Sequence, residues 1–333
     1  MWVSSMSTIM RSSSSSSSSS VLSLSPPRKY IVQVFAQMQQ QSMRKQTSAS
    51  SISCSSSFGR GNNESVAAAN KGKSKVAVVR GVPDSFANAL AMEKPASPVN
   101  LERAREQHAA YVQILRGLVQ EVIEIPADNQ YPDCPFIEDT AIVIGNQALI
   151  TRPGAVSRQG EEVEVHHALA KMGLKICEVQ PPGLIDGGDV LYASGLLFAG
   201  KSRRTNDDGI LALTNAFPEI GVHPIKVAKG LHLKSALTCI APRTLAVEDN
   251  EDAQAMFEEL QKMTAQHFKS FQVSVAGAAN TLWVGDTLLI SSTLAGDLEP
   301  HFKQFAGEVV PVDISEFHKA DGGLTCLSLI FEL

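Results

Sequence analysis

The 333-residue sequence lacks any run of about 18 uncharged apolar residues, so it does not predict a membrane-spanning helix. It also lacks a CxxC pair, and its five cysteines are an odd number, which argues against a disulfide or zinc framework. Reduced thiols are typical of an intracellular compartment. With 44% hydrophobic and 19% charged residues, the composition predicts a soluble globular protein.

Acidic residues are missing from the first 63 positions, since the first is Glu64. This stretch carries six Lys and Arg residues and an unbroken serine run over Ser12–Ser20. Such a leader is typical of an organelle transit peptide, and the alternative is a disordered tail or a mis-assigned start codon. We therefore expect residues 1–75 to be a disordered leader. A transit peptide would place the protein in a chloroplast or mitochondrion; otherwise we expect it in the cytoplasm.

The rest of the chain is strongly acidic. Removing the six positive charges of the leader from the net charge of −5 leaves −11 for the part that begins at Glu64. A body of this charge disfavours binding to nucleic acid, so we expect no nucleic-acid partner and no membrane partner.

A repeat becomes visible beyond about Val76. Apolar runs interrupted by a turn begin at positions 141, 189, 236 and 281, a spacing of 45 to 48 residues, and each run predicts a β-hairpin. Segments with helical periodicity alternate with the hairpins. The predicted helices cover residues 100–120, 160–173, 207–217, 251–267 and 297–306.

Five such units would form a closed ring. Four hairpins are complete, and a first strand at 76–82 could pair with a last strand at 324–333 to make the fifth. The fixed period predicts a five-bladed α/β propeller of hairpin-plus-helix units over residues 76–333. The alternative is a coincidental spacing within an ordinary α/β sheet.

The last predicted strand follows a glycine-rich turn that leads into Cys326. Free cysteines are usually buried and packed as small hydrophobes, so this position alone is weak evidence for a reactive thiol. Gly322 and Gly323 permit close approach of a ligand to the backbone, and Asp321 adds a charge beside an apolar strand.

Three carboxylates, Asp133, Glu138 and Asp139, surround the apolar segment Cys134–Ile137. Buried carboxylates are costly without a partner, so the cluster should face solvent or receive a cation. A planar guanidinium fits, because each carboxylate accepts two parallel hydrogen bonds. A metal is the competing interpretation, although no histidine stands at ligand spacing.

An ordered set of motifs resembles the dimethylarginine dimethylaminohydrolases over about residues 77–329. The set comprises Tyr131–Asp139, Thr151–Gly154, Leu184–Asp189, Ser202–Asn206, Gly230–Ser235 and Leu324–Cys326. The resemblance implies a five-bladed α/β propeller with the active site at its central channel. It also implies hydrolysis of Nω-methylated arginine to citrulline and a methylamine, without a cofactor or a metal, by a monomer or a homodimer.

The resemblance assigns three catalytic roles. Cys326 would attack the guanidinium carbon, His232 would act as general acid and then as general base, and Asp186 would orient the imidazole. His318 remains a rival histidine, since it lies eight residues before the cysteine. On a strand, His232 would project opposite to its leucine neighbours. Asp189 is interpreted as structural.

The remaining site residues are also carried over from the family. The carboxylate cluster would contact the guanidinium and amine, two arginines would hold the α-carboxylate, and Leu90 would belong to a loop that covers the pocket. The predicted substrate-binding residues are Leu90, Asp133, Glu138, Asp139, Arg152, Arg204, Ala320 and Asp321. Leu327 stands where some relatives carry a second cysteine, so redox or metal sensitivity based on paired thiols does not transfer.

Two alternatives stay open. One is an arginine or agmatine deiminase of the same superfamily, although arginine deiminases carry a helical insertion for which this chain has no room, and agmatine lacks the carboxylate that the arginines would bind. The other is a non-catalytic propeller, such as a ribosome-binding anti-association factor. The acidic body and the complete Cys, His and Asp set weigh against it.

Overall fold

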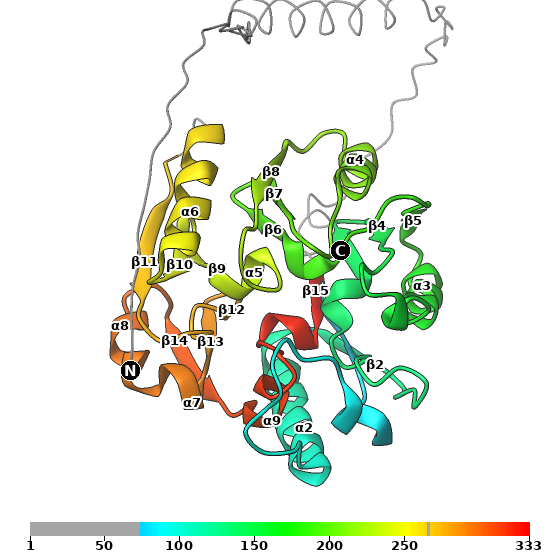
Figure 1. Ribbon diagram of the computed structural model, residues 1–333, viewed down its shortest axis with the longest axis horizontal. Helices are drawn as coiled ribbons and strands as arrows, with labels where there is room; N and C mark the ends of the chain where they lie inside the picture. The colour runs from blue at the N-terminus through cyan, green and yellow to red at the C-terminus, as the bar shows by residue number, and fades with distance from the viewer. Residues whose placement is uncertain (1–73, 265–266) are drawn as a thin grey trace, which may run out of the picture. The chain divides into compact units, whose positions relative to one another are not determined.

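The computed structural model describes residues 74–264 and 267–333, so the predicted leader lies outside the described residues except for its last two positions. Figure 1 shows the described part as a ring of small sheets with helices around it. It contains five three-stranded sheets, ordered β15-β1-β2, β3-β4-β5, β6-β7-β8, β9-β10-β11 and β12-β13-β14. This is the five-bladed α/β propeller that the repeat predicts.

The strands are short. In chain order they are β1 (Lys75–Arg80), β2 (Glu121–Ile125), β3 (Ala141–Ile144), β4 (Gln147–Ile150), β5 (Lys175–Glu178), β6 (Val190–Ala193), β7 (Leu196–Lys201), β8 (Val222–Lys226), β9 (Leu237–Ala241), β10 (Thr244–Glu248), β11 (Lys269–Val273), β12 (Leu282–Val284), β13 (Thr287–Ser291), β14 (Glu308–Val312) and β15 (Leu329–Glu332).

The helices connect the second and third strands of each blade or join neighbouring blades. They are α2 (Leu101–Leu118), α3 (Glu162–Lys171), α4 (Asp207–Ala216), α5 (Leu233–Ala236), α6 (Glu251–Met263), α7 (Ser292–Ala295), α8 (Glu299–Phe302) and α9 (Ser315–His318). The 3₁₀ helices are η1 (Asp84–Asn88), η2 (Ile137–Thr140), η3 (Val156–Arg158), η4 (Gly187–Asp189), η5 (Gly296–Leu298) and η6 (Thr325–Leu327). The helix predicted at 297–306 was wrong in extent, since that segment holds only the short η5 and α8.

All four predicted hairpins are present, and each has antiparallel strands. The sequence missed a third strand in every blade, which runs parallel to the central strand. These third strands are half-exposed and carry charges, as in the EVIEI of β2 and the KICE of β5. They therefore lack the apolar run that marks a buried strand.

The predicted fifth unit forms from the two ends of the described chain. β1 pairs antiparallel with β15, from Lys75 opposite Glu332 to Val78 opposite Leu329. The last strand begins at Leu329 rather than at 324, because residues 325–327 form η6 instead. Contacts between β15 and β3, β6 and β9, and β9 and β12 join neighbouring blades.

Helix α2 covers the blade that contains both chain ends. The side chain of Asn100 accepts a hydrogen bond from the backbone of Arg103 and caps the start of the helix. Tyr111 and Leu115 of this helix are fully buried in the same core cluster as Val79 of β1. The Tyr111 hydroxyl also contacts the carbonyl of Leu324, so this helix braces the segment that leads to Cys326.

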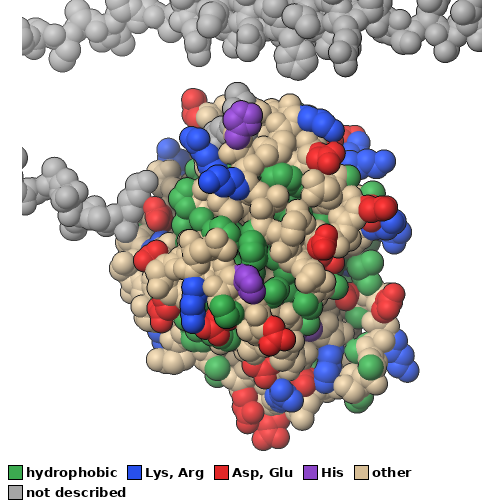
Figure 2. All heavy atoms as spheres, turned by 90° about the vertical axis from the view of Figure 1, so that its left-hand side faces the viewer, with side chains coloured by type: hydrophobic (Ala, Val, Ile, Leu, Met, Phe, Trp, Pro, Cys, Tyr) green, Lys and Arg blue, Asp and Glu red, His purple; other side chains and the backbone are tan. Residues whose placement is uncertain are grey.

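Among the described residues, no helix is long and apolar enough to cross a membrane. Figure 2 shows the face formed by α6, β11 and α8, where acidic and basic side chains are interspersed among hydrophobic ones. This face therefore offers no broad surface of one charge.

Candidate active site

The sequence predicted Cys326 at the start of a strand, but the residue lies in the middle of η6. The backbone N–H of Gly323 donates a hydrogen bond to its sulfur at 3.3 Å. Burial, reinforced by the charges of Glu138 and Asp139, raises the pKa of the Cys326 thiol to about 12. The thiol of the free protein is therefore protonated at neutral pH.

Asn280 fixes the turn that carries this cysteine. Its side-chain oxygen accepts from the backbone of Thr325 at 3.0 Å, and its amide nitrogen donates to the Thr325 hydroxyl at 3.1 Å and to the Lys234 carbonyl at 2.9 Å. A Cβ at Gly323 would lie 2.4 Å from Asn280 Cγ, so the close approach requires glycine. The thiol is thus held at a defined place next to the segment that follows His232.

His232 is the N-cap residue of α5, in extended conformation, and the expected strand is absent at this position. The ring is buried, and its Nε2 lies 2.9 Å from Oδ2 of Asp186. Asp186 is fully buried, and its Oδ1 accepts from the backbone N–H of Gly154 at 2.7 Å. Although burial opposes it, the pKa of His232 is raised to about 9, because Asp139 and the bond to Asp186 stabilise the imidazolium.

The carboxylate cluster is buried, and internal cations already neutralise part of it. Arg158 donates to Asp139 at 2.6 Å, and the ammonium of Lys234 lies 2.5 Å from Glu138. Burial raises the pKa of Asp139, but the charges of His232 and Arg158 lower it to about 2. The sequence predicts that this cluster faces solvent or receives a cation, and for Glu138 and Asp139 the chain itself supplies the cations. Burial raises the pKa of Asp133, which has no ion-pair partner in the described part of the chain.

The two predicted arginines approach the site from neighbouring loops. Arg204 Nη1 lies 3.7 Å from Oδ2 of Asp186, and its side chain is 18% exposed. Arg152 donates to the carbonyl of Gly183 at 3.4 Å and to Gln159 at 3.3 Å. A Cβ on Gly154 would lie 2.4 Å from the Arg204 backbone, so the loop after Arg152 packs directly on Arg204.

The loop around Leu90 is tied to two of the predicted substrate-binding carboxylates. The Leu90 N–H donates to Asp133 at 3.0 Å, and the Met92 N–H donates to the carboxylate of Asp321. Both side chains of the loop are exposed. Asp321 has a φ of 57°, an uncommon conformation for a non-glycine residue, and it follows the buried Ala320. The structure thus brings the predicted residues of this loop and of the C-terminal turn together.

Comparison with known proteins identifies the family. No family model matches the chain. The chain is 34% identical over 259 residues to the N(G),N(G)-dimethylarginine dimethylaminohydrolase of Streptomyces coelicolor. The matched region covers 77% of this chain and 96% of that protein. The chain belongs to the dimethylarginine dimethylaminohydrolase family.

Two further comparisons find similarity to a dimethylarginine dimethylaminohydrolase from another organism. The Pseudomonas aeruginosa protein of that name is 28% identical over 232 residues, 69% of this chain and 89% of its own. A solved structure of a cysteine-to-serine mutant of the Pseudomonas aeruginosa protein, complexed with citrulline, matches with a TM-score of 0.69 and 25% identity. It covers 78% of this chain and 99% of that one.

Within this dimethylarginine dimethylaminohydrolase fold, the rival histidine His318 and the second carboxylate Asp189 both make contacts of another kind. His318 uses both ring nitrogens, since Nε2 contacts the Ser291 hydroxyl and Nδ1 contacts the Gly322 carbonyl, each at 2.9 Å. Asp189 accepts from the hydroxyls of Ser202 and Thr205 at 2.6 and 2.7 Å and from the Leu233 N–H at 2.9 Å. These contacts indicate structural roles for both residues.

One group of side chains has a geometry that suits a cation. Asp139, Asp186 and His232 each offer one ligand atom, and these atoms lie within 4.8 Å of one another. The sequence argument against a metal, that no histidine stands at ligand spacing, is therefore insufficient, because the fold brings a distant histidine to the carboxylates. Arg158 and Arg204 already face Asp139 and Asp186, so a metal ion would compete with two arginines.

Three polar residues of the site were missed from the sequence: Arg158, Lys234 and Asn280. Arg158 is buried and makes hydrogen bonds to Asp139, Glu161 and the Phe136 carbonyl. Lys234 stands only two residues after His232, and that spacing was the one available signal. Nothing in the sequence near Asn280 points to the turn at Thr325, which is 45 residues away.

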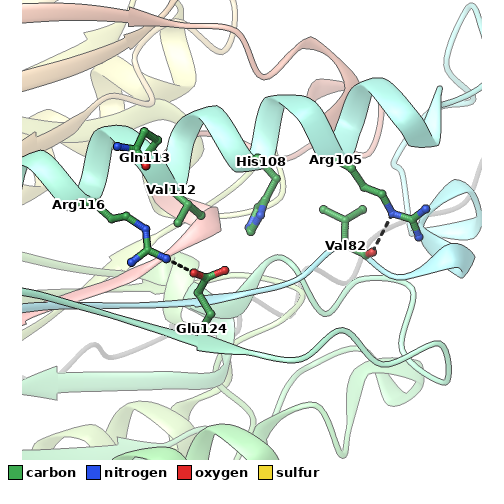
Figure 3. Close-up of a pocket in the computed structure, with 8 residues that line it drawn as sticks. Val82, Arg105, His108, Val112, Gln113, Arg116 and Glu124 are labelled. Carbon is green, nitrogen blue, oxygen red and sulfur yellow. Dashed lines mark hydrogen bonds and ion pairs between the residues drawn. The ribbon is translucent and has the colours of Figure 1, made fainter.

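A separate hollow of about 250 Å³ lies between α2 and β2, outside this site. Figure 3 shows His108 projecting from α2 toward the strand that carries Glu124. His108 is 7% exposed, and its Nε2 has no hydrogen-bond partner among the described residues. Burial lowers the pKa of His108 to about 4.

Stability should respond to the pH through His108. Its folded pKa of about 4 is below the unfolded value of about 6.5, so the stabilising contribution is present above pH 6.5 and is lost as the pH falls toward 4. Between pH 7 and pH 5 we expect the free energy of unfolding to fall by about 2 kcal/mol more in the wild type than in His108→Phe. Urea unfolding at both pH values measures this difference. His167→Phe, at an exposed histidine of α3, is the control, and equal pH dependence in all three proteins would contradict the argument.

Proposed function

We propose that this protein hydrolyses Nω,Nω-dimethyl-L-arginine to L-citrulline and dimethylamine, and Nω-methyl-L-arginine to L-citrulline and methylamine. The observation that carries the proposal is a single thiol, Cys326, whose electrostatic environment is set by the buried carboxylates Glu138 and Asp139. This charge distribution suits a cationic, planar guanidinium. Membership in the dimethylarginine dimethylaminohydrolase family supports the same substrate class.

The proposed chemistry has two steps at one carbon. The Cys326 thiol loses its proton to solvent when the cationic substrate binds, and its thiolate attacks the guanidinium carbon. The C–N bond then breaks as His232 donates a proton to the departing amine. His232 suits this role, because its pKa of about 9 keeps the imidazole protonated at neutral pH. Asp186 holds the ring through its bond to Nε2. Water then attacks the covalent adduct, so that an O–C bond forms and the S–C bond breaks. One proton of this water goes to His232, and the other goes to the Cys326 thiolate.

Substrate positioning is assigned to the loops around the thiol. Asp133 and Asp321, which accept hydrogen bonds from the backbone N–H groups of Leu90 and Met92, would receive the cationic α-amino group through their carboxylates. Arg152 and Arg204 would bind the α-carboxylate, a task for which a planar guanidinium fork is well suited. Ala320 would pack beside the aliphatic part of the substrate.

Arg204→Ala should weaken catalysis by about 2 kcal/mol in kcat/KM, since it removes a charge-assisted contact to the substrate carboxylate. Arg204→Lys keeps the charge but not the fork, and it should recover only part of this loss. The assay is steady-state formation of citrulline from dimethylarginine. The control substrate is a dimethylguanidine compound without a carboxylate, on which the two variants and the wild type should perform alike. Unchanged activity of Arg204→Ala on dimethylarginine would show that the proposed pose is wrong.

One assay separates the proposed function from its alternatives. The purified protein is incubated with asymmetric dimethylarginine, monomethylarginine, arginine and agmatine, and the ureido product is quantified. Formation of citrulline mainly from the methylated substrates supports the proposal. Product mainly from arginine or agmatine would make the protein a deiminase, and absence of any product would favour a non-catalytic propeller.

Location and assembly remain part of the proposal. The composition of residues 1–75 supports an organelle leader, with residues 76–333 as the catalytic domain. A monomer or homodimer is sufficient, because every residue assigned to the site comes from one chain. Import of a fluorescent fusion of residues 1–75 into chloroplasts or mitochondria would test the leader.

A further inference from the structure

The hollow between α2 and β2 has a volume of about 250 Å³, and none of the residues that line it is assigned to the active site. Val82 and Glu124 form one side of its wall. The other side is a single face of α2, because its residues recur at helical spacing: Arg105, His108, Ala109, Val112, Gln113 and Arg116. Figure 3 shows the two arginines near opposite ends of this face, with His108 and Val112 between them. The hollow therefore runs along the helix and has a cation near each end.

The middle of the wall is apolar. Val82 and Val112 are 8% and 5% exposed, and both belong to the core cluster beneath α2. Ala109 adds a methyl group to the same region. A dry cavity of about 150 Å³ is large enough to bind benzene. The hollow is larger than that, so it has room for an aromatic ring with a short side chain.

His108 places a polar group without a partner in this wall. The residue is more than nine-tenths buried, and it makes no hydrogen bond or ion pair within the described part of the chain. Because burial lowers its pKa to about 4, the ring is neutral at pH 7 and has one N–H to donate. An unpaired polar group in the interior is costly, so a ligand that supplies an acceptor would relieve a cost that the free protein carries.

The two arginines have donors to spare. Arg105 donates from Nε to the Val82 carbonyl and from Nη2 to Asp84, which lies outside the wall. Arg116 donates from Nη2 to Glu124. Within the described residues, Nη1 of neither arginine has an acceptor. The side chains of both ion pairs are exposed, and such pairs contribute little free energy, so a ligand can compete for the guanidinium groups.

The charge of the wall favours an anion. Two arginines face one glutamate, and the histidine is neutral, so the lining has a net charge of +1 at pH 7. This sign is opposite to that of the acidic body. Inorganic phosphate would leave the apolar middle of the hollow unfilled. A carboxylate attached to an apolar body uses both the cationic end and the apolar middle.

We propose that this hollow binds a small monocarboxylate with a compact apolar body. The carboxylate accepts from Arg105 and His108, which lie three residues apart on the same face of α2. The apolar body lies against Ala109 and Val112, in the direction of Arg116. The inference does not depend on the proposed function, because no lining residue takes part in that reaction.

The probe for this site is phenylacetate, titrated into the full chain at pH 7 by isothermal titration calorimetry. We expect one phenylacetate to bind per chain. Phenylacetamide has nearly the same shape without the charge, and it should bind more weakly by about tenfold or more. Arg105→Gln and His108→Phe should each weaken the binding of phenylacetate by a similar factor. Arg105→Gln changes only an exposed side chain, so misfolding does not explain a loss of binding in this variant.

Two variants locate the binding. Arg103→Gln is the matched control and should bind normally, because Arg103 is an exposed arginine of α2 that pairs with Asp313 and does not line the hollow. Arg204→Ala should also bind normally, and loss of binding there would place phenylacetate in the active site and overturn the proposal. Unchanged affinity in Arg105→Gln and His108→Phe would overturn it as well. Tighter binding of phosphate than of phenylacetate would show that the proposed class of ligand is wrong.

Discussion

Free protein at pH 7 is expected to show almost no thiolate absorbance from Cys326. Burial beside Glu138 and Asp139 raises the pKa of this thiol to about 12, which leaves a thiolate fraction on the order of 10⁻⁵ at neutral pH. Ultraviolet difference spectra against Cys326→Ser measure it, since the other thiols are common to both proteins. The charge of Lys234 lowers the pKa of the Cys326 thiol, but Lys234 is already paired with Glu138.

The thiolate should appear when a non-reacting guanidinium analogue of the substrate binds. A cation placed within a few ångström of the sulfur favours the charged form, so the substrate itself would activate its nucleophile. The competing route is a resting ion pair between thiolate and imidazolium, for which His232 has the necessary positive charge. One equivalent of Cys326 thiolate in the free protein at pH 6 would support that ion pair and contradict substrate-assisted activation.

Arg158→Met should reduce the free energy of unfolding by about 3–5 kcal/mol, the cost expected when one partner of a buried ionic network is removed. Arg158 is almost completely buried between two carboxylates, at 2.6 Å from Asp139 and 2.8 Å from Glu161. Without it, Glu161 would remain buried with no ion-pair partner among the described residues, and Asp139 would keep only the charge of His232. Urea unfolding of the wild type and of Arg158→Met measures the difference in the free energy of unfolding.

The controls for this prediction come from the same chain. Arg116→Met removes an exposed arginine that pairs with Glu124, and it should cost less than about 1 kcal/mol. Arg158→Met combined with Glu161→Gln removes the charge left without a partner and should recover part of the loss. Equal effects of Arg158→Met and Arg116→Met would mean that the buried network contributes little to stability.

The fold could be predicted to the extent that it depends on local sequence. The hairpins were visible because each pairs two apolar runs across a tight turn, as at Gly145 in the first of them. The parallel third strands could not be seen, because β2 and β5 form only when an intervening helix brings them to the sheet edge. η6 was mistaken for strand for a related reason, since an apolar run alone does not fix its conformation.

The residues of the site could be predicted where they belong to a family motif. The contacts that depend on packing between distant segments could not. The pairing of His232 with Asp186 joins residues 46 positions apart, and resemblance alone suggested it. The partners of Arg158 and Lys234 depend on which carboxylates the fold buries near them. Sequence reasoning left Glu138 and Asp139 without cations for this reason, and the structure supplies them from within the chain.

The pairing of β1 with β15 has a consequence for how the protein acquires its activity. Lys75 and Glu332 are partners across almost the whole length of the described chain, and Cys326 immediately precedes the last strand. Contacts between such distant positions form slowly, because a long loop must close before they are made. During synthesis the first four blades can assemble while Cys326, the proposed nucleophile, is still absent. The proposed nucleophile therefore reaches its partners only when the last strand closes the ring, so a nascent or misassembled chain would not present the proposed catalytic centre.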